Sequence, residues 1–232
     1  MIVLTFDTDW APQFVIDHVM AELKAARVKT TFFFTSPYNV GDELLVEKGI
    51  HPNFMSGSTQ GASESEVLIN LKTWYPDAVG SRSHRLYWHS GLAKRLTDRG
   101  ILYDSSIIMP FHPNLEPFKT QGITRFPFWW SDPLHLTSNL PFDCLNFPNL
   151  DKPGLKVLNF HPIHIYLNTK DLDAYSVMLN QVQLIETTPG VLSQFRQKGY
   201  GIGTLFSDIL EYIYRHQHRT VYLKDLLGDN WE

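Results

Sequence analysis

The feature that most constrains the fold is a regular alternation of short apolar runs with longer amphipathic segments. The runs are rich in β-branched and aromatic residues, as in IVLTF (residues 2–6) and VKTTFFFT (residues 28–35), and suit strands buried on both faces. Between these runs, residues 12–27 carry apolar side chains at helical spacing after a proline. Strands that alternate with helices predict a mostly parallel sheet, either an open sheet or a barrel.

At least six strand–helix units are visible in a chain of 232 residues, which favours a barrel in a single domain over residues 1–232. Ser63 and Glu66 form the pattern of a capping box before the helix expected at 64–75. Further strands are expected at residues 78–86, 101–106, 123–128 and 156–161, and residues 50–54 are expected to form a brief strand or an extended turn. Further helices are expected at residues 42–49, 91–100, 173–186 and 190–199, and residues 201–216 are expected to run from a strand into a helix.

Composition is that of an ordinary soluble enzyme. Hydrophobic residues make up 43% of the chain and charged residues 19%, which argues against disorder, and the formal charge of −4 predicts no nucleic-acid partner. The single cysteine, Cys144, excludes an internal disulfide and any multi-cysteine metal site. The opening MIVLTFDTDW lacks the basic region of a signal peptide, and no apolar run approaches the roughly 18 residues of a membrane span. We therefore expect a cytoplasmic protein without a membrane span.

Polar side chains with chemical potential gather at the carboxyl ends of the expected strands, where function concentrates in such barrels. Residues two apart on a strand share a face, so Asp7 and Asp9 are expected to point into one cavity. A packing account would have to explain each polar residue separately, so their joint occurrence indicates one site. The full set is Asp7, Asp9, His51, Arg82, His84, His161 and His164.

This set contains the parts needed for metal-assisted acyl hydrolysis. One carboxylate with two imidazoles is a usual ligand set for a catalytic zinc or similar divalent ion, with a position left open for water. The second carboxylate would serve as a base for that water, and an arginine beside the base would keep it ionised. A histidine across the cavity would protonate the leaving amine or alkoxide.

Structural interpretations remain open for the same residues. Asp7 and Asp9 could lie on a solvated turn that caps the following helix. His161 and His164 could be partly buried imidazoles in a proline turn. Aromatic residues make up 13% of the chain, and those in FPFWWSDP (residues 126–133) suit either sugar rings or ordinary packing under a loop.

The order of the motifs resembles the polysaccharide deacetylases, carbohydrate esterase family 4 with its NodB homology domain. TFDTDW (residues 5–10) resembles the first motif of that family, and TTFFF (residues 30–34) matches its second strand. The resemblance covers roughly residues 1–210 and implies a divergent branch of that α/β fold, a distorted (β/α) barrel with about seven parallel strands. The later motifs follow in the family's order as GIHPNF (49–54), GSRSHRLYW (80–88), GILYDSS (100–106), TRFPFWW (124–130) and VLNFHPIH (157–164).

The resemblance implies a role for each matching residue. Asp7 would be the catalytic base and Asp9 a metal ligand. Arg82 would orient Asp7. His51 would be a second metal ligand, and His161 would be the general acid.

Three positions depart from the usual family pattern. Thr8 separates two aspartates that are commonly adjacent, and Met55 stands four residues after His51, where a second metal histidine is usual. The arginine motif carries His84 in place of its usual proline. We therefore infer that His84 is the third metal ligand, with His164 as the alternative. If neither reaches the ion, the protein would bind metal weakly or not at all.

These features predict a metal-dependent hydrolase, expected to use zinc, that removes an acyl group such as acetyl from an N-acylated sugar. Because no secretion signal is evident, a polysaccharide precursor such as a sugar nucleotide is favoured, in surface-polysaccharide biosynthesis. Two alternatives remain: an amidohydrolase acting on a small amide, and a carbohydrate-binding homologue without metal. The expected substrate-binding residues are Trp10, Trp88, Trp129 and His164.

Overall fold

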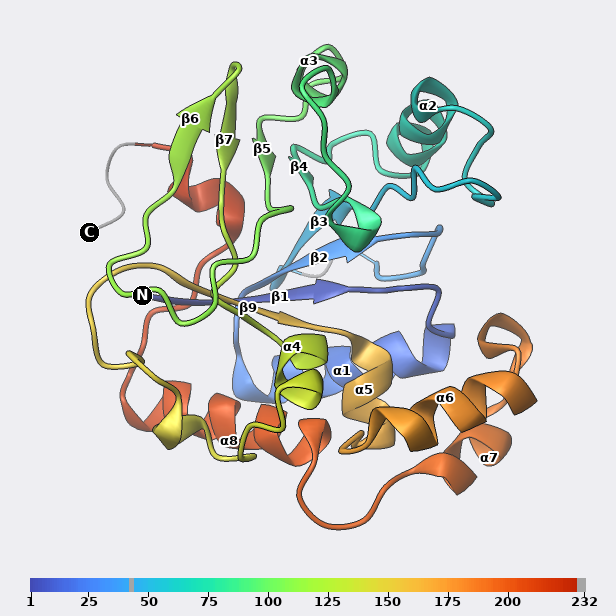
Figure 1. Ribbon diagram of the computed structural model, residues 1–232, viewed down its shortest axis with the longest axis vertical. Helices are drawn as coiled ribbons and strands as arrows, with labels where there is room; N and C mark the ends of the chain where they lie inside the picture. The colour runs from blue at the N-terminus through green and yellow to red at the C-terminus, as the bar shows by residue number, and fades with distance from the viewer. Residues whose placement is uncertain (42–43, 229–232) are drawn as a thin grey trace.

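The computed structural model describes residues 1–41 and 44–228, and its centre is one curled sheet that forms a half-barrel (Figure 1). Its strand order is β6-β7-β5-β4-β3-β2-β1-β9-β8, and every neighbouring pair is parallel except β6 with β7. The expected distorted barrel is confirmed, with nine described strands in place of about seven. The strands are β1 (Ile2–Asp7), β2 (Thr30–Phe34), β3 (Val46–Ile50), β4 (Gly80–Ser81), β5 (Tyr103–Asp104), β6 (Phe118–Thr120), β7 (Ile123–Arg125), β8 (Trp130–Ser131) and β9 (Lys156–Phe160).

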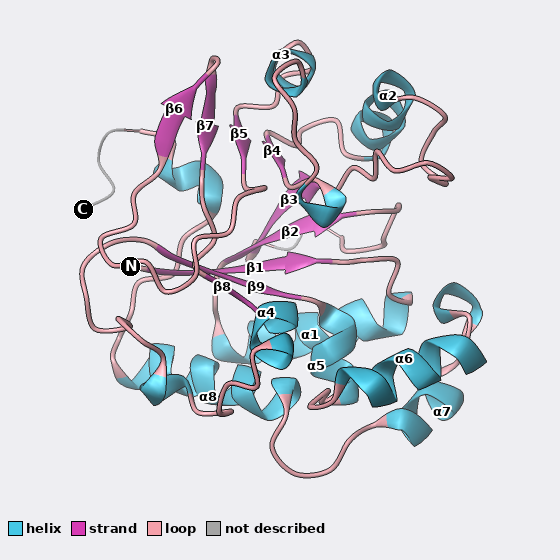
Figure 2. Ribbon diagram, viewed as in Figure 1, coloured by secondary structure: helices cyan, strands magenta, loops and turns pink. Residues whose placement is uncertain are grey.

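Helices surround this sheet, with α1, α5 and α8 gathered on one side and α2 and α3 beyond β3, β4 and β5 (Figure 2). None of the described helices is long and apolar enough to cross a membrane. The helices are α1 (Gln13–Ala26), α2 (Glu64–Trp74), α3 (Leu92–Thr97), α4 (Asp132–Thr137), α5 (Pro162–Leu167), α6 (Leu172–Gln181), α7 (Pro189–Leu192) and α8 (Ile202–Arg215). Short 3-10 turns lie at His84–Leu86, Cys144–Asn146, Leu184–Glu186, Ser193–Phe195 and Leu223–Leu226.

Strand β1 lies fully buried between β2 and β9 and sets the position of the carboxylates at its carboxyl end. Every residue of the strand is buried, and the Phe6 ring stacks on Phe32 of β2 with centroids 4.5 Å apart. Phe6 is also in register with Phe160 of β9. Burial of a phenylalanine side chain contributes about 1.5–3 kcal/mol, so this aromatic layer holds the three strands together. Because the strands are parallel and in register, their carboxyl ends meet at one edge.

Two of the expected helices are confirmed closely. The helix expected at residues 12–27 is α1, and the helix expected at 64–75 is α2. Ser63 is the N-cap of α2, and its side chain accepts a hydrogen bond from the Glu66 backbone N–H at 3.3 Å. The capping pattern therefore predicted this helix start correctly.

The helix expected at residues 42–49 is wrong where the structure describes it. Residues 46–50 form β3, which pairs with β2 and β4, and residues 42 and 43 lie outside the described part of the chain. The Glu47 carboxylate is buried, where it accepts hydrogen bonds from the hydroxyls of Thr31 at 2.7 Å and Tyr103 at 2.9 Å. Pairing within the sheet and these buried acceptor bonds outweigh a weak local preference for helix.

Several element boundaries also differ from expectation. The strand expected at 78–86 is reduced to β4, and residues 84–86 form a 3-10 turn in which Arg85 and Leu86 adopt left-handed backbone conformations that no strand accommodates. The strand expected at the start of the described residues 201–216 does not form, since Gly201 is already the N-cap of α8. The helix expected at 173–186 ends at Gln181, and the one expected at 190–199 is reduced to α7 and the following 3-10 turn.

Gly80 leaves the space into which Tyr103 packs, two residues before Arg82. A Cβ at Gly80 would stand 2.0 Å from the Tyr103 ring, and Glu47 holds that ring by its hydroxyl. We expect Gly80→Ala to lower the free energy of unfolding by about 1–3 kcal/mol, measured by urea denaturation. Gly190→Ala is the control, because its Cβ would meet no atom within 4 Å, and it should stay within about 0.5 kcal/mol of wild type. Equal stability of the two variants would contradict this packing.

Candidate active site

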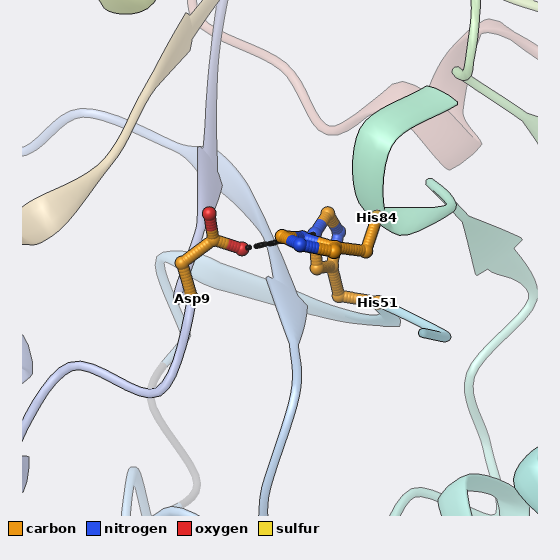
Figure 3. Close-up of side chains that lie close together, drawn as sticks. All are labelled: Asp9, His51 and His84. Carbon is orange, nitrogen blue, oxygen red and sulfur yellow. Dashed lines mark hydrogen bonds and ion pairs between the residues drawn. The ribbon is translucent and has the colours of Figure 1, made fainter. Parts of the chain in front are cut away.

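Three side chains converge at the carboxyl end of the sheet. Asp9 follows β1, His51 follows β3, and His84 begins the 3-10 turn after β4 (Figure 3). Asp9 Oδ1 lies 3.1 Å from His51 Nε2 and 3.2 Å from His84 Nδ1, and the two nitrogens are 3.3 Å apart. Four tetrahedral ligands at roughly 2.0–2.1 Å from a zinc ion stand about 3.3–3.4 Å from one another. The three donor atoms therefore have the spacing of three corners of a metal tetrahedron.

Local backbone geometry turns Asp9 out of the strand and toward these histidines. Asp9 and Trp10 both adopt positive φ, 37° and 56°, which ends the strand geometry at Asp7. The Thr35 backbone N–H donates to the Thr8 hydroxyl at 3.0 Å, and the Trp10 N–H donates to the Thr35 hydroxyl at 3.1 Å. Thr8, which separates the two aspartates, thus ties the turn to the neighbouring strand and leaves Asp9 facing the site.

The Asp7 carboxylate is held on both oxygens by buried donors. Arg82 Nη1 donates to Asp7 Oδ1 at 3.0 Å, and Asn159 Nδ2 donates to Asp7 Oδ2 at 2.8 Å. Arg82 also donates to Asn159 Oδ1 at 2.6 Å, to the Thr5 hydroxyl at 2.9 Å and to the Ser105 carbonyl at 3.0 Å. Arg82 is fully buried, and these hydrogen bonds fix the orientation of its guanidinium. Because one of them goes to Asp7, they also fix the position of the Asp7 carboxylate.

His161 lies on the other side of Asp9 and is held by Asp132. The Asp132 carboxylate contacts His161 Nδ1 at 2.6 Å and accepts the His161 backbone N–H at 2.6 Å. His161 Nε2 then faces Asp9 Oδ2 at 3.4 Å. Burial lowers the pKa of His161, but the carboxylates of Asp132 and Asp9 together outweigh burial and hold that pKa well above its usual value.

The pKa of the Asp9 carboxyl is shifted in the opposite direction, downward. Burial raises its pKa, but hydrogen bonds from His161, His51 and His84 outweigh burial and hold the pKa well below the usual value. Asp9 is therefore a carboxylate surrounded by three imidazoles. An anionic oxygen with nitrogen donors is the donor chemistry that zinc and similar divalent ions take.

Asp132→Asn is expected to lower kcat by about 100-fold, because neutralising Asp132 removes the charge that keeps His161 protonated and oriented. Metal content should stay unchanged, since Asp132 pairs with His161 and does not belong to the group of three clustered donors. Steady-state kinetics and elemental analysis of the same preparation test this. Asp143→Asn, at an exposed helix cap, is the matched control and should keep wild-type kcat. A wild-type kcat in Asp132→Asn would contradict the role of the pair.

A cavity of about 400 Å³ opens over these residues. Its lining also includes the apolar side chains of Leu86, Phe128 and Leu134. A cavity of about 460 Å³ elsewhere contains Trp74 but none of the clustered donors. The expected site residues that line the cavity of about 400 Å³ are Asp7, Asp9, His51, His84 and His161.

Two tryptophans expected to bind substrate lie away from this cavity. Trp129 has no exposed surface and packs edge-on against Phe111, with centroids 5.0 Å apart, so the expectation that it contacts substrate is wrong. Phe126 and Trp130 of the same aromatic run are also buried, whereas Phe128 lines the cavity. Trp88 stacks on the Arg125 guanidinium, 3.5 Å from the ring centroid, and is not part of the cavity wall.

The other two expected binding residues also lie outside the cavity lining. Trp10 packs edge-on against His84, with ring centroids 5.2 Å apart, and so supports that ring from the side. His164 is buried, its Nδ1 pairs with the Thr169 hydroxyl at 3.1 Å, and burial lowers its pKa to about 4. The structure groups His84, and not His164, with the other two donors. Met55 lines a separate cavity.

Asp132 and Asn159 take part in the site although the sequence did not single them out. Asn159 lies two residues before His161, so strand alternation could have placed its side chain toward the same face. Asp132 directly follows β8, which is the parallel neighbour of β9, but its run of aromatic and proline residues was interpreted as a loop. Strand order, which the sequence does not reveal, brings Asp132 beside His161.

The curled, mostly parallel half-barrel is the fold of a solved polysaccharide deacetylase structure that the chain resembles. Residues 4–179 match the family model described as WbmS-like polysaccharide deacetylase, and the chain belongs to that family. No curated protein matches the sequence.

Solved structures agree with this family. A candidate polysaccharide deacetylase of Bordetella bronchiseptica, involved in O-antigen biosynthesis, is 29% identical, with a TM-score of 0.82 over 91% of this chain and 90% of that chain. A family 4 pseudoenzyme from Bacillus anthracis shares the fold at 12% identity, with a TM-score of 0.51 over 99% of this chain and 66% of that one. A peptidoglycan N-acetylglucosamine deacetylase does so at 13% identity, with a TM-score of 0.50 over 97% and 86%.

Proposed function

We propose that the protein is a metal-dependent hydrolase that removes an acyl group from an N-acylated sugar of a surface polysaccharide or its precursor. The observation that carries this function is the cluster of Asp9, His51 and His84 in a cavity flanked by Asp7 and His161. Membership of the deacetylase family supports the reaction class. The involvement of the Bordetella relative in O-antigen biosynthesis supports the substrate class.

Asp9, His51 and His84 would hold the ion, and zinc suits one carboxylate with two imidazoles. When bound, a divalent ion supplies a Lewis acid that polarises the acyl carbonyl and makes water a stronger nucleophile at neutral pH. The spacing of 3.1 to 3.3 Å between the three donor atoms supports this ligand set.

Asp7 accepts the proton of the attacking water. Its two oxygens are held by Arg82 and Asn159, so the carboxylate keeps one orientation at the cavity wall. A base fixed in this way needs no rearrangement when the water attacks, which favours proton transfer.

His161 donates a proton to the leaving nitrogen. Asp132 occupies Nδ1, so Nε2 is the ring nitrogen directed to the cavity side. The carbon–nitrogen bond breaks as nitrogen gains this proton, and the products are a free amino sugar and the carboxylate of the acyl group. A base with its arginine and an acid with its aspartate have no use in a metal-free binding protein, which favours an enzyme over that alternative.

The test is elemental analysis of the purified protein, followed by acetate release from a panel of N-acetylated sugars and small amides. We expect about one equivalent of zinc, acetate released from sugars, and loss of that release after chelation. Absence of metal even after zinc titration, together with absence of acetate release, would overturn the function. Release from small linear or cyclic amides alone would favour the amidohydrolase alternative.

A further inference from the structure

The cavity carries one cation that the proposed chemistry does not use. Arg85 lines the cavity and has an exposed side chain. Within residues 1–41 and 44–228, no hydrogen bond, ion pair or ring contact engages its guanidinium. Arg82, by contrast, is buried and donates to four partner residues.

The backbone places Arg85 at the cavity in an unusual conformation. Arg85 has φ 55° and ψ 26°, and Leu86 also has φ 55°, so two consecutive L-residues are left-handed. Such conformations cost free energy and collect at ligand-binding sites. The turn is held by the His84 N–H, which donates to the Pro52 carbonyl at 2.9 Å, and by the Leu86 N–H, which donates to Ser83 at 3.0 Å.

The carboxylates of the site are already engaged by other partners. Asp7 pairs with Arg82, and Asp9 is surrounded by the imidazoles that would share its metal ion with it. Asp132 is buried against His161. Among the described residues, Arg85 therefore has no counterion at the cavity, and the wall around it includes apolar side chains such as Leu86, Ile108 and Phe128.

We propose that Arg85 binds an anionic group of the substrate, so that the N-acylated sugar carries a carboxylate or a phosphate. An arginine is always charged, and its planar fork matches either group with two parallel hydrogen bonds. Uncharged sugars offer this guanidinium neutral oxygen acceptors but no opposite charge. This inference rests on the proposed function and names the class of sugar on which that site acts.

The test compares N-acetylglucosamine with N-acetylglucosaminuronic acid and N-acetylglucosamine 1-phosphate, by calorimetric Kd and by kcat/KM for acetate release. Arg85→Asn removes the charge and keeps the backbone, because asparagine tolerates the left-handed region. Arg85→Lys keeps the charge. Arg27→Asn is the matched control, since Arg27 is also exposed and left-handed, with φ 55°, at the C-cap of α1.

We expect the zinc-loaded wild type to bind one of the anionic sugars at least about 10-fold more tightly than the neutral sugar. Arg85→Asn should abolish that preference, Arg85→Lys should keep part of it, and Arg27→Asn should leave it intact. The anion that shows the preference identifies carboxylate or phosphate. Because the guanidinium is exposed, the preference should weaken as salt concentration rises.

An unchanged preference in Arg85→Asn, or an equal loss of affinity for neutral and anionic sugars, would overturn the inference. Acetate release without any preference for anionic sugars would overturn it and leave the proposed function standing. Binding preference that depends on Arg85, without acetate release from any sugar, would support the inference and count against the hydrolase. Neither binding nor release would overturn both.

Discussion

Asp7→Asn is expected to lower kcat by about 1,000-fold while one equivalent of metal stays bound. The amide has nearly the shape of the carboxylate but does not accept the proton of the attacking water, so turnover is lost. Metal is expected to stay because the clustered donor atoms belong to Asp9, His51 and His84. Stopped and steady-state assays of acetate release, with elemental analysis of the same sample, measure both quantities.

The Asp7→Asn variant is interpretable only if the protein still folds, and this depends on the remaining partners of Arg82. Losing the Asp7 charge removes the counter-charge of a buried guanidinium, which is destabilising in general. Arg82 keeps acceptors on Asn159, Thr5 and Ser105, so the fold is expected to persist, and thermal unfolding checks this. Wild-type kcat in a folded, metal-loaded variant would contradict the role of Asp7 as base. Loss of metal together with activity would make Asp7 a ligand instead.

His84→Ala is expected to weaken zinc binding by at least about 100-fold. Removal of one of three protein ligands should cost more than loss of a residue that only orients a ligand, for which 10- to 100-fold is typical. His84 Nδ1 lies 3.2 Å from Asp9 Oδ1 and 3.3 Å from His51 Nε2, so alanine leaves two donor atoms in place of three. Competition titration against a zinc chelator measures the change.

His164→Ala is the matched control for His84→Ala. It removes an imidazole that is buried, bonded to Thr169 and outside the donor cluster. Zinc affinity should therefore stay within about threefold of wild type, while stability falls because a buried ring is removed. Zinc binding that survives in His84→Ala and is lost in His164→Ala would reverse the assignment of the third ligand.

Much of the fold followed from local patterns. The buried apolar run of β1, the helical spacing of α1 and the capping pattern of α2 were all interpretable without tertiary information. The helix expected before residue 50 failed, because Glu47 is buried by hydroxyls of Thr31 and Tyr103, from strands that only the sheet brings near. The secondary structure of a long periodic segment can be predicted from its own sequence, whereas that of a short strand depends on the strands with which it pairs.

Some residues of the candidate site could also be selected from the sequence, and others could not. Asp9, His51 and His84 could be selected because carboxylate and imidazole residues stood at successive strand ends, and the structure groups them. Their roles, like those of Asp7 and His161, stay predictions. Trp129 was wrong as a substrate residue, since aromatic composition does not distinguish a binding surface from a packed core.

The sequence by itself determined which side chains are available for metal and proton chemistry, because residue type sets donor atoms and charge. Only the tertiary structure decided which of them meet. Strand order placed Asp132 beside His161, and the turn after β4, which no strand pattern predicts, carried His84 to Asp9 and Arg85 to the cavity. Distances of about 3 Å between residues far apart in the sequence, such as Asn159 and Asp7 at 2.8 Å and 152 positions apart, depend on packing of the whole sheet and not on local preference.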